Sequence, residues 1–309
     1  MNFALIGCGN MADIYAKKIF SSDTMRLAAV FHREQEKAER FARPYEAKAY
    51  SNYQEMLGNP EVEAVIVTVP TFLHKEFVLE AARHKKHVLC EKPLALNSSD
   101  AREMSRACEE NGVRLYVAQV VRFFPEYAAI RQAVSKGQVG QPRYVRAKRL
   151  THNPSVGSWY ADTTKSGGVV LDLMIHDLDF LQWTFGPAKL REARQTKNDK
   201  LHHVVVELEL RNGLRAEVES MWGYTGPFTT SIVVSGAKGE LRHDSTSGSE
   251  GEEGVEVPEF HEGEDPYLQQ IEHFKQGVEQ QQPFIVDPEE VIQTMELVER
   301  VTTFLQTRS

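Results

Sequence analysis

The stretch GCGNMA, residues 7–12, constrains the fold more than any other part of this chain. It follows the apolar run FALI and leads into the amphipathic MADIYAKKIF, so a strand runs directly into a helix. Gly7 permits a tight turn, Gly9 lets a pyrophosphate approach the backbone, and Ala12 lets helix and strand pack closely. An ordinary tight turn is the alternative, but the position at the head of a βαβ unit favours a dinucleotide site, with the phosphates at the helix N-terminus.

The first third of the chain alternates apolar runs with amphipathic segments. Strands are expected in the further runs 26–31, 63–70, 87–93 and 113–120, and helices in 33–42, 72–84 and 97–112. Asn97 or Ser98 is the expected cap of the last of these helices, with Gly112 just past its end. Continuous apolar strands alternating with helices predict a doubly wound parallel sheet, an N-terminal Rossmann domain that we expect to occupy residues 1–122.

The pattern changes beyond this point, and residues 123–309 are expected to form a C-terminal α+β domain for substrate binding and oligomerisation. In VVVELEL, residues 204–210, apolar and charged side chains alternate, and the hairpin signal Asn212-Gly213 follows. The runs LRAEVES, TTSIVVSG and GELRH continue the alternation, which predicts an open, mainly antiparallel sheet covered on one face. Asp287 and Pro288 begin a C-terminal helix, which we expect to pack back on the first domain.

Composition excludes several classes of function. The net charge is −8, and the segment 250–265 holds eight acidic residues and no Lys or Arg. Positive and negative charges are therefore equal in number over the rest of the chain. Neither a nucleic-acid surface nor a membrane partner is indicated, because no basic patch and no apolar run of membrane-spanning length occurs. Three cysteines without paired or metal-type spacing, and no basic segment ahead of the first strand, favour the cytoplasm.

The residues after the second predicted strand bear on the choice of cofactor. An acidic residue commonly binds the ribose 2′-hydroxyl here, but this chain has His32 followed by Arg33. An arginine can pair with a 2′-phosphate, so the sequence favours NADP over NAD. The alternative, NAD, has Arg33 stacking on adenine or facing solvent while Glu34 reaches the ribose.

Ligands of open α/β sheets bind beyond the carboxyl ends of the strands, where two stretches of this chain stand out. Thr68, Pro70 and His74 follow one strand, although a histidine at a helix start is more often a capping or surface residue. Lys92 follows another strand within CEKP and is held extended by Pro93. Its amine is a candidate for proton transfer or substrate anchoring, unless it is a solvated surface lysine.

Asp172 and His176 lie four residues apart in GGVVLDLMIHDLDF, a stretch that otherwise calls for burial. Residues at this spacing share one face of a helix, so both side chains can point at the same place. The alternative is a helix start with two capping carboxylates and a satisfied core histidine. Asp177 and Asp179 point elsewhere on the helix and are expected to be structural.

Together these motifs resemble the glucose-fructose oxidoreductase/inositol dehydrogenase/rhizopine catabolism (Gfo/Idh/MocA) family of nicotinamide oxidoreductases. The resemblance covers essentially the whole chain and rests on GCGNMA, VIVTVPTFLHKE, CEKPLAL, VVRFFPEY, GQVGQPRYV and SGGVVLDLMIHDLDF. It implies a cis peptide between Lys92 and Pro93, and assembly into homodimers or homotetramers through the open sheet. Val169 and Met174 depart from the family, because many members have glycine at both positions.

The resemblance also implies the residues of the site. The cofactor contacts are Gly7, Gly9, Asn10, Met11, Ala12, His32, Arg33, Thr68, Pro70, His74, Glu91 and Lys92. The substrate contacts are Lys92, Arg122, Trp159, Lys165, Asp172 and His176. The substrate class is a sugar, an inositol or a related polyol.

We expect Lys92, Asp172 and His176 to be catalytic and to meet over one nicotinamide ring. An alcohol gives up hydride as its proton leaves, and an imidazole is a suitable base because it titrates near neutral pH. Asp172 would orient the hydroxyl or the imidazole, and Lys92 would stabilise negative charge on oxygen. No metal is expected, since no third ligand has suitable spacing. Two alternatives are a glycosidase that retains its cofactor and a regulator that binds sugar or nicotinamide without turnover.

Overall fold

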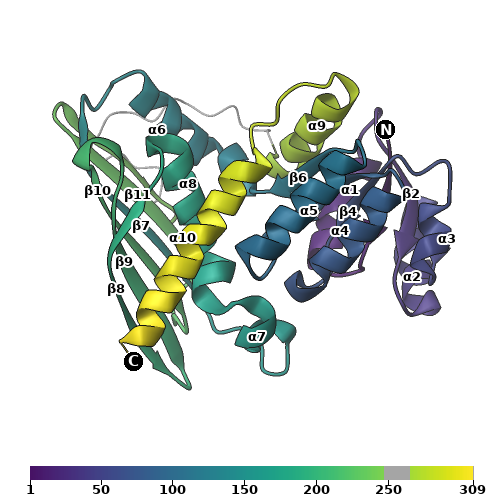
Figure 1. Cartoon of the computed structure of the whole chain (residues 1–309), viewed down its shortest axis with the longest axis horizontal. Helices are drawn as coiled ribbons and strands as arrows, with labels where there is room; N and C mark the ends of the chain where they lie inside the picture. Colours follow the sequence, from purple (N-terminus) through teal and green to yellow (C-terminus); the bar gives the residue numbers. More distant parts are fainter. Residues whose placement is uncertain (247–264, 309) are drawn as a thin grey trace. The chain divides into compact units, whose positions relative to one another are not determined.

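The computed structural model describes residues 1–246 and 265–308 and divides into two compact units. The first unit contains Met1–Val120 and the described part of Glu264–Val291, and the second contains the described parts of Val121–Gly263 and Ile292–Ser309 (Figure 1). Most of the acidic segment 250–265 lies outside the described residues. Within the described ranges, no helix has the length and apolar character needed to cross a membrane.

The first unit is built on a six-stranded parallel sheet, which confirms the predicted Rossmann architecture. The strand order is β3-β2-β1-β4-β5-β6. The strands are β1 (Asn2–Ile6), β2 (Arg26–Phe31), β3 (Lys48–Tyr50), β4 (Ala64–Val67), β5 (His87–Glu91) and β6 (Leu115–Ala118). Five of them are buried along nearly their whole length, as expected for a sheet covered on both faces. The sequence prediction missed β3, because three residues are too few to show a pattern.

Helices connect the strands of this unit. They are α1 (Asn10–Phe20), α2 (Gln35–Ala42), α3 (Tyr53–Leu57), α4 (His74–Arg83), α5 (Ser98–Glu110) and α9 (Pro266–Glu279), with short 3-10 turns η1 (Arg43–Tyr45) and η2 (Thr71–Leu73). The predicted cap of α5 is confirmed, since the Asn97 side chain accepts a hydrogen bond from the Asp100 amide. Helices α4 and α5 lie side by side (Figure 1).

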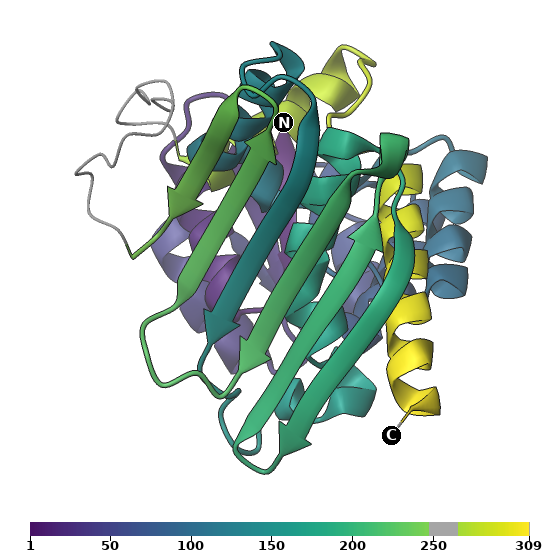
Figure 2. The same cartoon turned by 90° about the vertical axis from the view of Figure 1, so that its left-hand side faces the viewer.

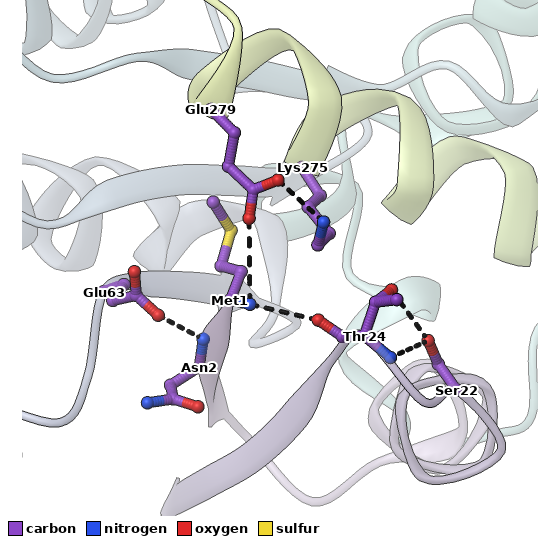
Figure 3. A network of polar contacts seen from close by, with 7 residues as sticks. All are labelled: Met1, Asn2, Ser22, Thr24, Glu63, Lys275 and Glu279. Carbon is purple, nitrogen blue, oxygen red and sulfur yellow. Dashed lines mark hydrogen bonds and ion pairs between the residues drawn. The ribbon is translucent and has the colours of Figure 1, made fainter.

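Helix α9 is the late addition to this unit, about 150 residues after β6 in the sequence. It packs against α1, and its N-terminal cap Asp265 pairs with Lys18 of α1 at 2.6 Å. At the other end of α9, Glu279 lies 3.8 Å from the amino group of Met1, which donates to the Thr24 carbonyl at 3.1 Å (Figure 3). Polar contacts therefore anchor both ends of α9 to other parts of the first unit.

The second unit contains a six-stranded sheet in the order β12-β11-β7-β10-β9-β8. Its strands are β7 (Pro142–Thr151), β8 (Lys189–Asn198), β9 (Leu201–Glu209), β10 (Arg215–Trp222), β11 (Thr229–Gly236) and β12 (Gly239–Asp244). The predicted hairpin is confirmed: Asn212 and Gly213 have positive φ angles of 58° and 75° and join β9 to β10. The central pair β7–β10 is parallel, so the sheet is mixed, although mainly antiparallel as predicted.

Helices of the second unit cover one face of its sheet. They are α6 (Pro125–Ser135), α7 (Thr163–Ser166), α8 (Ile175–Phe185) and α10 (Pro288–Thr307), with a π turn η5 (Val170–Met174) and the 3-10 turns η3 (Val120–Phe123), η4 (Trp159–Ala161) and η6 (Arg211–Gly213). Figure 2 shows the strands side by side with none of the described helices on the near face. Helix α10 is bound to α8 by a hydrogen bond from Gln182 to Thr294 at 2.9 Å. Its packing on the first domain stays a prediction.

The uncovered face of this sheet is charged. Arg146 of β7 pairs with Glu217 of β10 at 3.0 Å, and Lys148 pairs with Glu219 at 3.3 Å. A homo-oligomer formed through this face stays a prediction.

Candidate functional site

The glycine-rich turn at the end of β1 has the geometry that a dinucleotide requires. Gly7 has a φ of +107°, and a Cβ there would lie 3.0 Å from Thr68 Oγ1, so the fold itself needs glycine. Gly9 differs, because its φ of −92° suits any residue and a Cβ there would meet nothing within 4 Å. The fold therefore does not require glycine at position 9, and the bare backbone before α1 fits a pyrophosphate.

The neighbouring residues of this turn divide into buried and exposed ones. Ala12 lies in the first turn of α1 and is fully buried, which agrees with close packing of helix and strand. Asn10 is exposed and Met11 half-buried at the N-terminus of α1. The hydroxyl of Thr68 donates to the Ile6 carbonyl at 2.9 Å, so it ties β4 to β1.

The turn after β2 presents an exposed cation. His32 Nδ1 accepts a hydrogen bond from the Glu34 amide at 3.0 Å, which holds the imidazole against its own turn. Glu34 pairs with Lys37 at 2.9 Å, and this bond lowers the pKa of the Glu34 carboxyl. The Arg33 side chain is 88% exposed. The turn after β2 and the start of α2 therefore carry a guanidinium, an ammonium group and one carboxylate.

His74 begins α4 and is almost completely buried, so it is not a surface residue. Its Nδ1 lies 2.9 Å from the Pro93 carbonyl oxygen, and its Nε2 lies 2.8 Å from the Val69 carbonyl oxygen. Burial lowers the pKa of the imidazole, while the carbonyl groups oppose that effect. His74 therefore connects the loops that follow β4 and β5 and positions their backbones.

The loop after β5 contains the cis peptide between Lys92 and Pro93 that the resemblance implies. Lys92 is half-buried at the carboxyl end of the strand. The Glu91 side chain turns inward and accepts hydrogen bonds from the Tyr15 hydroxyl at 2.6 Å and from the Lys92 amide at 3.0 Å. The contact of Glu91 with the cofactor stays a prediction.

In the second unit, Asp172 and His176 interrupt a buried segment. Every other residue from 168 to 181 is buried, whereas these two keep partial exposure. Asp172 lies in the π turn η5 and His176 in the first turn of α8, so the segment is not the regular helix that was predicted. π turns inside helices are frequent at functional sites. Val169 and Met174, which depart from the family, are fully buried and fill the core.

The two aspartates that follow His176 are structural, as predicted. Asp177 accepts bonds from Arg149 at 2.9 and 3.0 Å, and Asp179 accepts two bonds of 2.8 Å from Arg122. Arg122 is 2% exposed, and its guanidinium lies over the Trp183 ring. Arg122 is therefore held by Asp179, and its contact with substrate stays a prediction.

The segment ahead of Asp172 carries the other two predicted substrate contacts. Trp159 and Tyr160 stack with ring centroids 3.8 Å apart and an interplanar angle of 28°. Lys165 pairs with Asp162 at 2.9 Å on the exposed surface of α7. Contacts of Trp159 and Lys165 with substrate stay predictions.

His202, which lies near the start of the π turn, was not singled out by the sequence analysis. Its Cε1 lies 3.9 Å from the position that a Cβ on Gly168 would take, close to the start of the π turn. Burial, with a smaller contribution from the charge of Lys197, lowers the pKa of His202 to about 4, so the imidazole is neutral at pH 7. In the sequence, His202 stands just before the alternating apolar residues of β9, which places it on or next to a strand. The sequence does not show which side of the sheet it faces.

Within residues 1–246 and 265–308, no group of three or more His, Cys, Asp or Glu side chains is arranged to hold a metal ion.

Known proteins resemble this chain in both halves. Residues 1–119 match the oxidoreductase family with an NAD-binding Rossmann fold, GFO_IDH_MocA, and residues 127–242 match the GFO/IDH/MocA C-terminal domain. An uncharacterized oxidoreductase of Streptococcus pneumoniae is 30% identical over 79% of this chain and 68% of its own length. Myo-inositol 2-dehydrogenase of Thermotoga maritima is 27% identical over 94% of this chain and 92% of its own length.

Solved structures agree with the fold. GenD2 from gentamicin A biosynthesis, in complex with NAD, has a TM-score of 0.89 and 20% identity, covering 100% of this chain and 95% of its own. KijD10, a 3-ketoreductase from Actinomadura kijaniata in complex with NADP, has a TM-score of 0.87 and 20% identity, covering 99% and 98%. From the two domain matches and the 30% identical relative, we conclude that this chain belongs to the GFO/IDH/MocA family of NAD-binding oxidoreductases.

Proposed function

We propose that this protein transfers hydride between a nicotinamide cofactor and a CH–OH group of a sugar, an inositol or a related polyol. The observation that carries the proposal is the exposure of Asp172 and His176 within a segment that is otherwise buried. A fold that needed only a helix here would bury apolar side chains at both positions. The family and its polyol-oxidising relative in Thermotoga maritima support the same substrate class.

The three proposed catalytic residues have distinct tasks. His176 takes the hydroxyl proton as the carbon gives up its hydride, and it returns the proton when a ketone is reduced. Asp172 orients the substrate hydroxyl or the imidazole. Lys92 stabilises the negative charge that develops on the oxygen.

A bound nicotinamide supplies the hydride acceptor or donor at its C4 atom. Gly9 and the N-terminus of α1 would hold its pyrophosphate, and His74 would position the loops that carry Val69 and Pro93. We favour NADP, because the exposed Arg33 can pair with a 2′-phosphate, and NAD is the alternative.

Cellular setting and assembly belong to the same proposal. Cys8, Cys90 and Cys108 are free thiols, which suits a reducing compartment, and we place the protein in the cytoplasm. We also propose a homodimer or homotetramer, as the family resemblance implies.

Substitution of the two titratable residues tests the proposal. His176→Gln or Lys92→Met should lower kcat by at least about 100-fold, the usual scale for loss of acid–base catalysis. Matched controls are His84→Gln and Lys17→Met, which remove surface groups of the same types and should leave kcat within about twofold. Near wild-type turnover in His176→Gln or Lys92→Met would reject the assigned roles.

A further inference from the structure

Strand β9 carries a histidine on the helix-covered side of the sheet in the second unit. Successive side chains of a strand point to opposite faces, and Val204 and Val206 of β9 are fully buried. His202 shares their face, whereas His203 points to the open side and lies 3.1 Å from Glu219. His202 is therefore the first residue of β9 on the side that the helices cover.

The pairing of the strands places His202 at one end of this sheet. Trp222 of β10 pairs with His202 of β9 on one side and with Thr151 of β7 on the other. The Trp222 side chain is buried and meets the imidazole edge to face, with ring centroids 6.4 Å apart. Strands β7 and β10 end at Thr151 and Trp222, so His202 lies at the rim of the sheet.

The segment that holds Asp172 and His176 begins next to this histidine. A Cβ on Gly168, four residues before Asp172, would lie 3.9 Å from His202 Cε1, which is van der Waals contact. The φ of +71° at Gly168 also favours glycine there. The π turn that follows packs on β10, the strand paired with β9. His202, Asp172 and His176 all belong to the second unit.

The chemistry of His202 suits a hydrogen bond with a hydroxyl group. Its Nε2 lies 3.2 Å from Oε1 of Gln195, which can only accept, so Nε2 carries the proton. Burial, more than the charge of Lys197, lowers the pKa of the imidazole to about 4. The ring is neutral at pH 7, and its Nδ1 is an acceptor.

The exposure of His202 points in the same direction. Its side chain keeps partial exposure, whereas Val204 and Val206 on the same face are fully buried. A side chain that served only to fill the core would be apolar, as these two are.

We propose that His202 is a further substrate-binding residue, whose Nδ1 accepts a hydrogen bond from a hydroxyl group of the polyol. Asp172 and His176 come from a turn and a helix, and His202 adds a contact from the sheet. The role of His202 is to orient the substrate and not to transfer its proton. The inference rests on the proposed function for the place of the substrate site.

Protection of the imidazole from acylation tests this proposal without turnover. Diethylpyrocarbonate acylates unprotonated imidazole nitrogens, and peptide fragmentation by mass spectrometry distinguishes His202 from His203. The full-length protein with NADP is treated at neutral pH while myo-inositol, D-glucose or D-gluconate is titrated separately. At about ten times its Kd, at least one of the three should slow acylation of His202 by about tenfold, because the site is then mostly occupied. The rate at His203 should not change.

A matched pair of variants tests the same residue in turnover. His202→Phe keeps a ring but removes Nδ1, so the KM for the polyol should rise about tenfold, the scale of one lost hydrogen bond. The value of kcat should change by less than about threefold, since proton transfer is assigned to His176. His203→Phe should leave both quantities unchanged. His202→Asn should restore much of the affinity, because its amide oxygen can replace Nδ1, and a purely structural role predicts no such rescue.

The two measurements separate this inference from the proposed function. Turnover of a polyol with the same KM in wild type and His202→Phe would overturn the inference and leave the proposed function intact. Protection of His202 by a polyol that the protein does not oxidise would support the inference and count against the proposed function. Neither protection nor turnover would overturn both. If His202→Phe does not fold, the protection of wild-type His202 decides the matter.

Discussion

Each unit places a buried carboxylate next to a proposed catalytic residue. The two carboxylates differ in their partners. In the second unit, Asp177 follows His176 and forms an ion pair with Arg149. In the first unit, Glu91 precedes Lys92 and accepts hydrogen bonds from neutral groups. The ion pair cancels most of the negative charge of Asp177. The role of Asp177 is therefore to anchor α8 to β7, the strand that carries Arg149. Glu91 instead holds the backbone of Lys92 through its amide and receives the Tyr15 hydroxyl.

The largest expected effect concerns the anchors of the second unit. Arg149→Met leaves the Asp177 carboxylate buried without its ion pair, which should lower the free energy of unfolding by about 3–5 kcal/mol. Urea unfolding of the variant measures this loss. Arg308→Met removes the exposed pair with Glu192 and should cost less than about 1 kcal/mol. A loss as small in Arg149→Met would show that Asp177 is not an anchor, and the comparison with Glu91 would fail.

The corresponding anchor of the first unit is His74. His74→Phe leaves the buried Pro93 carbonyl oxygen and the part-buried Val69 carbonyl oxygen without this partner, at a cost of about 1–3 kcal/mol in unfolding free energy. The KM for the cofactor should also rise, because the loops after β4 and β5 lose their connection. His84→Phe, at the other end of α4, is the control and should change neither quantity. An unchanged cofactor KM in His74→Phe would limit His74 to a purely structural role.

Acid should destabilise the second unit through His202. Its pKa is about 4 in the fold against an ordinary value of 6.5, so between these values the unfolded chain binds a proton that the folded chain does not. Stability should therefore fall as the pH decreases from 6.5 to 4, by about 1–2 kcal/mol after allowance for its partial exposure. His202→Gln should remove this part of the pH dependence, whereas the neighbouring His203→Gln should keep it. Parallel stability–pH curves for wild type and His202→Gln would contradict the assignment.

The smallest expected effect concerns the choice of cofactor in the first unit. Arg33→Ala should lower kcat/KM with NADP by about tenfold, which corresponds to about 1.4 kcal/mol, and leave kcat/KM with NAD nearly unchanged. Arg40→Ala, further along α2, serves as the control. An equal decrease with both cofactors would mean that Arg33 does not recognise the 2′-phosphate.

Sequence patterns predicted those parts of the fold that depend on backbone chemistry. The glycine turn at Gly7, the cap at Asn97 and the hairpin at Asn212-Gly213 were all recognisable, because each needs a particular residue at a particular place. The strands β3, β7 and β8 were missed. Strand β3 is very short, while β7 and β8 are rich in charged residues that form ion pairs across the open sheet.

The site was predictable where motifs mark it, and less so where distant residues meet. Lys92, Asp172 and His176 were identified by motif, and their roles stay predictions. The partners of Glu91 were not predictable, because Tyr15 and Gln270 are 255 residues apart and nothing in either local pattern indicates their hydrogen bond. The burial of Arg122 was missed for the same reason, since its partner Asp179 lies 57 residues away.

The proposed reaction is tested most directly by following absorbance of the reduced cofactor while wild-type protein is mixed with aldoses, inositols and sugar acids. NAD and NADP are used in parallel, and His176→Gln is assayed beside wild type. The account predicts stoichiometric cofactor reduction with at least one polyol, faster with NADP, and a loss of at least about 100-fold in His176→Gln. Cofactor binding with no reduction of either cofactor by any of these substrates, and no oxidation with the corresponding ketones, would contradict it.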